Sequence, residues 1–186
     1  MTSRVSEGGQ PTKIYTIGHS TRSAAEFVAL LEAHGVRKLV DVRTIPASRH
    51  NPQFNSDALT ATLAAAGVAY AHMPSLGGLR RAKPDSINTG WRNASFRGYA
   101  DYMQTPEFAA AIDELIGIAG AQPTGIMCAE AVPWRCHRSL IADALLVRDV
   151  PAVEIISASR TTLHRMTPFA HVAGRKITYP PEGLPL

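Results

Sequence analysis

The sequence predicts an α/β fold with three layers: a mostly parallel, five-stranded sheet with helices on both faces. Short apolar runs alternate five times with segments of helical periodicity, and the connections between them are mostly short. Polar residues gather directly after the apolar runs, at one end of each predicted strand. We expect right-handed crossovers and a flavodoxin-like or related doubly wound order of strands.

The predicted elements follow from apolar periodicity and from helix-capping residues. Ser23 with Glu26 forms a capping box, and Thr105 followed by Pro106 is a strong helix start. Gly35 is placed to end the first helix. Strands are expected at 13–17, 38–43, 68–72, 124–128 and 151–156, with a further edge strand at 176–179. Helices are expected at 24–34, 56–66, 96–103, 106–120 and 134–148.

The composition fits one domain at 13–186. The chain has 186 residues, of which 45% are hydrophobic, which is enough for a well-buried core. Residues 1–12 are polar and lack an apolar signal region, so we expect a disordered lead-in. No apolar run approaches the roughly 20 residues that span a bilayer, so no membrane association is expected. Two cysteines are too few for a secreted disulfide framework, which indicates a reducing cytoplasm.

Charged side chains follow several of the predicted strands. His19, Arg43 and His72 each lie at or just after a strand end, and Glu130 comes two residues after another strand. Ligands of open α/β sheets bind at the carboxyl ends of the strands. We therefore expect these side chains to meet in one site for an anionic small molecule or a nucleotide.

The richest stretch runs from 128 to 138, where two thiols, a carboxylate, an imidazole and two guanidinium groups lie within eleven residues. Glu130 is the candidate general acid or base; its alternative is a salt bridge to Arg43 or Arg138. Cys136 is expected near the first turn of a helix, where a thiol can be a nucleophile, although a buried cysteine is often inert. The predicted catalytic residues are Glu130, His19, His72 and Cys136.

Ligand binding is assigned to a second group of residues, from several loops. These are Arg43, Ser48, Gly77, Gly78, Tyr99, His137 and Arg138. The paired glycines allow the backbone to approach a phosphate closely, or merely turn the chain. The spacing of Cys128, Cys136 and His137 does not match a structural zinc site, so no metal is predicted, and the sequence identifies no cofactor.

The segment 80–97 carries five basic residues and one acidic residue, a net charge of +4. Trp91, Phe96 and Tyr99 interleave with these cations, which is a mixture used for stacking bases. The alternative is that the aromatic side chains form the apolar face of a helix. The loop at 79–93 is long for a compact domain, which favours a functional role.

Several separated motifs occur in a familiar order. They are Gly18-His19-Ser20, Asp41-Val42-Arg43 with Pro46 and Ser48, Tyr70 with His72 and Leu76-Gly77-Gly78, Phe96 with Tyr99 to Met103, and Met127-Cys128-Ala129-Glu130 with Cys136-His137-Arg138. Over roughly 13–156 the chain resembles the family called domain of unknown function 488. The resemblance implies one domain in which these motifs form a single site, and it implies no particular reaction.

Three function classes remain open from the sequence. The first is a hydrolase or group transferase acting on a phosphate-bearing or nucleotide-like ligand. The second is a nucleic-acid-binding or DNA-processing accessory protein, and the third is a non-catalytic sensor of an anionic ligand. Dinucleotide-dependent hydride transfer is disfavoured because no Gly-x-Gly-x-x-Gly follows the first strand. The sequence leaves the oligomeric state unknown.

Overall fold

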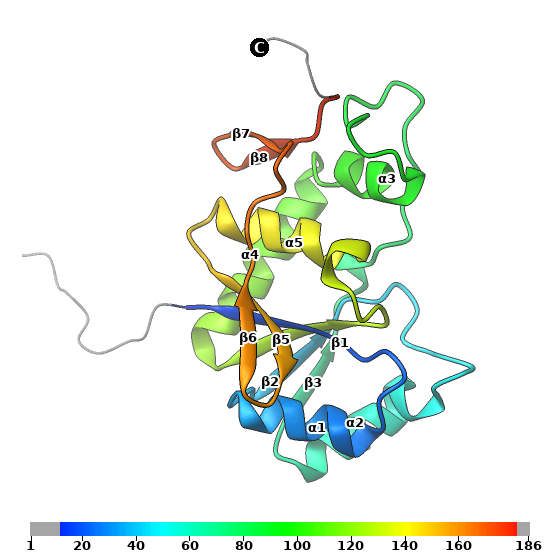
Figure 1. The fold of residues 1–186 in the computed structure, drawn as a ribbon, viewed down its shortest axis with the longest axis vertical. Helices are drawn as coiled ribbons and strands as arrows, with labels where there is room; N and C mark the ends of the chain where they lie inside the picture. The colour runs from blue at the N-terminus through cyan, green and yellow to red at the C-terminus, as the bar shows by residue number, and fades with distance from the viewer. Residues whose placement is uncertain (1–11, 182–186) are drawn as a thin grey trace, which may run out of the picture.

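The computed structural model describes residues 12–181 and has an α/β architecture (Figure 1). Apart from Thr12, the predicted lead-in at 1–12 lies outside the described residues. The strands of the main sheet are β1 (Ile14–Gly18), β2 (Lys38–Asp41), β3 (Ala69–His72), β4 (Thr124–Cys128), β5 (Ala152–Ser157) and β6 (Arg160–Leu163). The helices are α1 (Ala24–Ala33), α2 (Ser56–Ala65), α3 (Ala94–Tyr102), α4 (Pro106–Ala121) and α5 (Arg138–Leu146).

The main sheet has six strands in the order β3-β2-β4-β1-β5-β6. The first five strands run parallel, and β6 pairs antiparallel with β5. The predicted count of five strands was therefore too low. The strand that was missed, β6, is exposed along its whole length and reads Arg-Thr-Thr-Leu, so it carries no apolar signal.

The flavodoxin-like order of strands is not confirmed. In that order the first two strands are neighbours. Here β4 lies between β1 and β2, with Gly18 opposite Cys128 and Asp41 opposite Met127. This insertion places the end of β4 at the centre of the carboxyl edge, between the loops that follow β1 and β2.

Two hydrophobic cores cover the two faces of the sheet. Figure 1 shows α1 and α2 on one side of the sheet and α4 and α5 on the other. Phe27 and Leu59 belong to the core beneath α1 and α2, whereas Ile112, Leu115 and Leu140 belong to the core beneath α4 and α5. The predicted three-layer arrangement with helices on both faces is confirmed.

The predicted capping residues start their helices. The Ser23 side chain accepts a hydrogen bond from the Glu26 backbone N–H, and Glu26 accepts one from the Ser23 backbone, as in a capping box. The Thr105 side chain accepts from the N–H of Phe108, with Pro106 in the first helical position.

The carboxy-terminal part differs from the prediction in one further respect. The strand expected at 176–179 exists as β8 (Lys176–Thr178), but it pairs with β7 (His171–Ala173) in a separate two-stranded sheet. It is therefore not an edge strand of the main sheet. Among residues 12–181, no helix combines the length and the apolarity that a membrane crossing requires.

Candidate functional site

A cavity of about 350 Å³ opens at the carboxyl edge of the sheet. The loops after β2, β3 and β4 and the start of α3 form its walls, as expected for a ligand site of an α/β sheet. The lining residues are Arg43, Thr44, Ile45, Ala47, Gly78, Leu79, Ser95, Phe96, Cys128, Ala129, Glu130, Arg135, Cys136 and His137. The aliphatic side chains of Ile45 and Leu79 are 62% and 73% exposed.

The loop after β4 is held against the end of β1. The backbone N–H groups of His19 and Ser20 donate to the carbonyl oxygens of Cys128 and Ala129. A Cβ atom at Gly18 would lie only 1.8 Å from the Glu130 carbonyl oxygen. The close approach of the two loops therefore requires a glycine at position 18.

Helix α5 begins later than predicted. The residues Pro133–Arg135 form a short 3-10 turn, and Cys136 has an extended backbone, so α5 begins at Arg138 rather than near Trp134. Cys136 consequently lies before the helix and not within its first turn. The 3-10 turn folds the loop back, which brings Cys136 to the end of β4.

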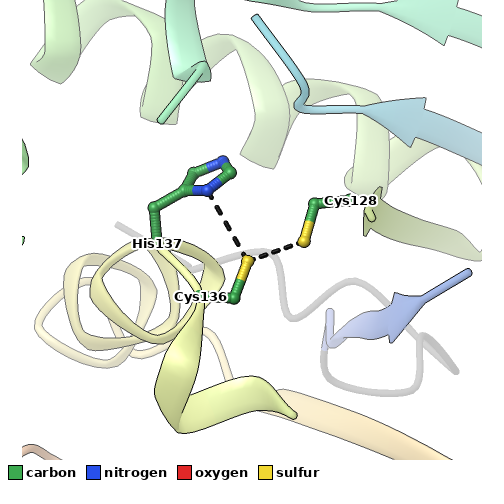
Figure 2. Close-up of side chains that lie close together, drawn as sticks. All are labelled: Cys128, Cys136 and His137. Atoms are coloured by element: carbon green, nitrogen blue, oxygen red, sulfur yellow. Dashed lines mark hydrogen bonds between the residues drawn. The ribbon is translucent and has the colours of Figure 1, made fainter. Parts of the chain in front are cut away.

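Two thiols and an imidazole lie close together (Figure 2), and all three residues line the cavity. The sulfur atoms of Cys128 and Cys136 lie 2.6 Å apart, and Nδ1 of His137 lies 3.6 Å from the Cys136 sulfur. The other ring nitrogen, Nε2, donates to the Val42 carbonyl oxygen over 2.9 Å. Since a carbonyl oxygen only accepts, a neutral His137 ring carries an unprotonated Nδ1 on the side of the thiols.

The two thiols have different pKa values. The hydrogen bond from Cys128, assisted by the Arg138 charge, lowers the pKa of Cys136 to about 7 despite its burial. Burial raises the pKa of Cys128. Burial also lowers the pKa of His137. The Cys136 sulfur is thus the more acidic of the pair, and the imidazole beside it stays neutral.

Arg138 links the site to the sheet behind it. Its Nε donates to the Cys128 sulfur over 3.0 Å, and its Nη2 donates to the Glu130 carbonyl oxygen over 2.7 Å. Its Nη1 donates to the Thr16 hydroxyl over 2.6 Å and lies 3.3 Å from the Glu154 carboxylate. The guanidinium is 1% exposed, so this network fixes the loop after β4 from inside the protein.

Arg43 is held in position by neighbouring groups. Its Nε and Nη2 donate to the two carboxylate oxygens of Asp41, and Nη2 also donates to the Phe54 carbonyl oxygen. Tyr70 donates its hydroxyl to the same carboxylate. The remaining nitrogen, Nη1, is buried and has no hydrogen-bond partner among residues 12–181.

The structure brings five of the predicted site residues to the cavity. These are Glu130, Cys136, Arg43, Gly78 and His137. Six others do not line it, namely His19, His72, Ser48, Gly77, Tyr99 and Arg138. Of these, His19 stacks on Phe54 with its ring buried, and His72 donates a ring N–H to the Arg43 carbonyl oxygen.

Several of the aromatic and basic residues near 80–97 serve the structure itself. The Tyr99 ring is fully buried, and its hydroxyl donates to the Leu76 carbonyl oxygen. Trp91 packs against Phe96 and against residues near the carboxy-terminal hairpin. Arg80 lies over the Tyr102 ring at 3.6 Å. The exposed cations of this segment are Arg81, Lys83 and Arg92.

Sequence reasoning missed the partners of Arg138. Thr16 and Glu154 lie inside strands that were read as plain core elements. A signal was present, because a carboxylate within an apolar strand needs a buried partner. Cys128 is buried in the core, and its contact with Cys136 depends on the turn at 133–135, which the sequence did not predict.

The comparisons with known proteins agree with the motif pattern. The family described as Domain of unknown function DUF488 matches residues 23–145, which include the loops after β2, β3 and β4 and most of α5. Neither a curated protein nor a solved structure matches the chain. Since the match covers more than half of the chain and contains every residue that lines the cavity, the protein belongs to the DUF488 family.

Proposed function

We propose that the protein is a hydrolase or group transferase that acts on a phosphate-bearing or nucleotide-like small molecule at the carboxyl edge of the sheet. The observation that carries this proposal is the composition of one cavity wall. Arg43, Arg135 and Glu130 line the same cavity as the Cys136 and His137 pair. Cations that bind an anion, next to a carboxylate that can move a proton, are the groups such a reaction needs.

Arg43 is the strongest candidate for binding the anion. Its bidentate contact with Asp41 fixes the guanidinium in one orientation, and its Nη1 has no partner among the described residues. An unpaired buried nitrogen of a cation costs free energy unless a ligand satisfies it. Arg43 lines the cavity, so a phosphate bound there would lie against its charge, and Arg135 would add a second cation from the opposite loop.

Glu130 is available for proton transfer. The sequence left open a salt bridge from Glu130 to Arg43 or Arg138. In the structure Arg43 pairs with Asp41 and Arg138 pairs with Glu154, while Arg138 contacts only the carbonyl oxygen of Glu130. The exposed Glu130 carboxylate accepts a hydrogen bond from the backbone N–H of Val132. No ion pair to these arginines therefore removes it from use as an acid or base.

Chromatographic detection of the products formed from a panel of phosphomonoesters, phosphodiesters and nucleotides, with and without an acceptor alcohol, tests the proposal. Glu130→Gln is expected to lower turnover of the best substrate by about 10²–10⁴-fold, the usual contribution of a general acid or base, while its affinity changes little. Glu114→Gln, an exposed position on α4, is the matched control and should turn over like the wild type.

Three results would count against this proposal. Equal turnover by the Glu130→Gln and Glu114→Gln proteins would remove Glu130 from the chemistry. Thermal stabilisation by a nucleotide without any product would instead favour the non-catalytic sensor. A gel shift that weakens steeply with salt would favour nucleic-acid binding through the exposed cations Arg81, Lys83 and Arg92.

A further inference from the structure

We propose that Cys128, Cys136 and His137 together bind one zinc ion in the wall of the cavity. The binding itself stands apart from the proposed function, whereas a catalytic role of the ion would rest on it. This inference departs from the prediction of no metal, which used only the spacing of the three residues along the chain. In the fold, Cys128 at the end of β4 lies next to Cys136 and His137, which directly precede α5 (Figure 2). The spacing of known zinc motifs along the sequence does not describe ligands that come together in this way.

The three ligand atoms are close enough to share one ion. The two sulfur atoms and one nitrogen of His137 all lie within 4.8 Å of one another. Bond lengths of about 2.3 Å to sulfur and 2.0 Å to nitrogen place tetrahedral ligand atoms about 3.3–3.8 Å apart. The distance of 3.6 Å between Nδ1 and the Cys136 sulfur already fits. The sulfur atoms, 2.6 Å apart, would have to separate by about 1 Å to bind the same ion.

His137 is oriented as a metal ligand should be. Its Nε2 donates to the Val42 carbonyl oxygen, so its Nδ1 presents a lone pair to the thiols. Metal-binding histidines characteristically donate their second ring N–H to a carbonyl or carboxylate in this way. Gly78 packs directly on the ring, and a Cβ atom there would lie 2.5 Å from Nδ1. The ring orientation is thus fixed on one side by Val42, directly after β2, and on the other by Gly78.

The charges and the softness of the ligands favour zinc. Two thiolates and a neutral imidazole neutralise a divalent zinc ion, so the centre adds no net charge to a buried place. Behind it, Arg138 donates to the Cys128 sulfur and is itself paired with Glu154. Thiolate and imidazole ligands select zinc over the hard magnesium and calcium ions, which prefer oxygen.

The three residues leave a fourth position for water or substrate. Cys128, Cys136 and His137 all line the cavity. Structural zinc sites are usually closed by four protein ligands, whereas catalytic sites use three and keep one position open. Glu130 lines the same cavity, which places a carboxylate on the side from which a fourth ligand would enter.

Cobalt titration of the full-length, reduced, metal-free protein tests the site, because Co²⁺ reports its own coordination in absorption spectra. We expect one equivalent of Co²⁺ to bind with the visible bands of a tetrahedral ion and with sulfur-to-cobalt charge transfer. Zn²⁺ should displace it, and native mass spectrometry should show one zinc per chain. Free thiols, counted with a chromogenic disulfide reagent, should fall from two to none when zinc binds tightly.

Matched variants locate the ligands. His137→Gln keeps a side-chain N–H that can donate to Val42 but removes the nitrogen that faces the thiols. It should lose more affinity than the roughly 10–100-fold that removal of an outer partner costs. Cys136→Ser should bind Co²⁺ more weakly and show a smaller charge-transfer band, because only the Cys128 thiolate remains. His50→Ala, at an exposed loop position, should bind like the wild type. Circular dichroism of each metal-free variant checks that it is folded.

Any of three results would overturn the inference. The first is the absence of thiolate charge transfer at one equivalent of Co²⁺, and the second is equal affinity of the His137→Gln and His50→Ala proteins for Co²⁺. The third is a Cys128–Cys136 disulfide in protein purified under reducing conditions. The Glu130→Gln protein separates this inference from the proposed function, because it should bind zinc normally and yet lose turnover. Turnover by protein shown to be metal-free would refute a catalytic role of the ion and leave the enzyme proposal intact.

Discussion

The buried pair of Arg138 and Glu154 provides the sharpest test of how the site is supported. Arg138 is 1% exposed and Glu154 is 6% exposed. Replacement of Arg138 by methionine keeps most of the side-chain volume but leaves the Glu154 carboxylate buried without its cation. It also removes the donors to Thr16, to the Cys128 sulfur and to the Glu130 carbonyl oxygen.

The expected loss for Arg138→Met is about 3–5 kcal/mol of unfolding free energy at pH 8, the usual cost of removing one partner of a buried ion pair. In a chain of this size, each kcal/mol corresponds to about 2–4 °C, so the melting temperature should fall by roughly 10 °C. The double variant Arg138→Met/Glu154→Gln should recover at least half of the loss, because no charge then stays buried alone.

The loss should also depend on pH in a defined direction. Burial raises the pKa of Glu154 even though Arg138 opposes the shift. Without Arg138 the pKa should rise further. A carboxyl group whose pKa is higher in the folded than in the unfolded state stabilises the fold at pH values below its unfolded pKa. This contribution is lost as the pH rises through the pKa of the folded state. The deficit of Arg138→Met should therefore be smaller at pH 5 than at pH 8.

Urea unfolding of the wild type, both single variants and the double variant gives the coupling energy between the two side chains. A chelator in every sample removes any contribution of bound metal. A loss below about 1 kcal/mol for Arg138→Met at pH 8 would show that the pair contributes no more than an exposed one. A deficit that grows as the pH falls would have the wrong sign for an unpaired carboxylate.

Two further expectations concern stability. Gly18→Ala places a methyl group against the Glu130 carbonyl oxygen and should cost more than about 2 kcal/mol in urea unfolding, whereas Gly117→Ala, with nothing within 4 Å, should gain about 0.5–1 kcal/mol. Equal effects would contradict the close approach of the loops. Burial of Asp101 opposes its ionisation, but hydrogen bonds from the loop at 83–88 lower its pKa overall. Its carboxylate therefore stabilises the fold at pH values above the unfolded pKa, and this contribution is lost as the pH falls through the folded pKa. In a plot of melting temperature against pH, Asp101→Asn should therefore show a smaller decrease at acidic pH than the wild type.

The parts of the fold that depend on local sequence were predicted well. The apolar runs gave the five parallel strands, and Ser23 and Thr105 cap helices where expected. Local signals of this kind act within a few residues. The order of strands depends instead on contacts between distant segments, and no local sequence signal near β4 predicts that it lies between β1 and β2. The exposed β6 lacks the apolar residues that would reveal a strand.

The site was predicted in part for the same reason. The rule that ligands bind at the strand ends predicted that Arg43 and Glu130 lie near each other, and both line one cavity. The contact between Cys128 and Cys136 was not predicted, because it forms only where the loop after β4 folds back. His19 follows a strand end as well, but its ring turns inward and stacks on Phe54. The direction of a side chain at a strand end depends on its packing against distant residues, and local sequence patterns do not predict that packing.

The insertion of β4 between β1 and β2 has a consequence for folding. During synthesis the first hundred residues contain β1, β2 and β3, yet β1 can pair with neither of the other two in the native way. The native neighbours of β1 are both made later, so its exposed apolar edges must wait for distant segments to arrive, which slows folding and invites association between chains. The strand that joins β1 to β2 is also the one that ends in Cys128. The contact between Cys128 and Cys136 is therefore tied to the insertion of β4 into the sheet.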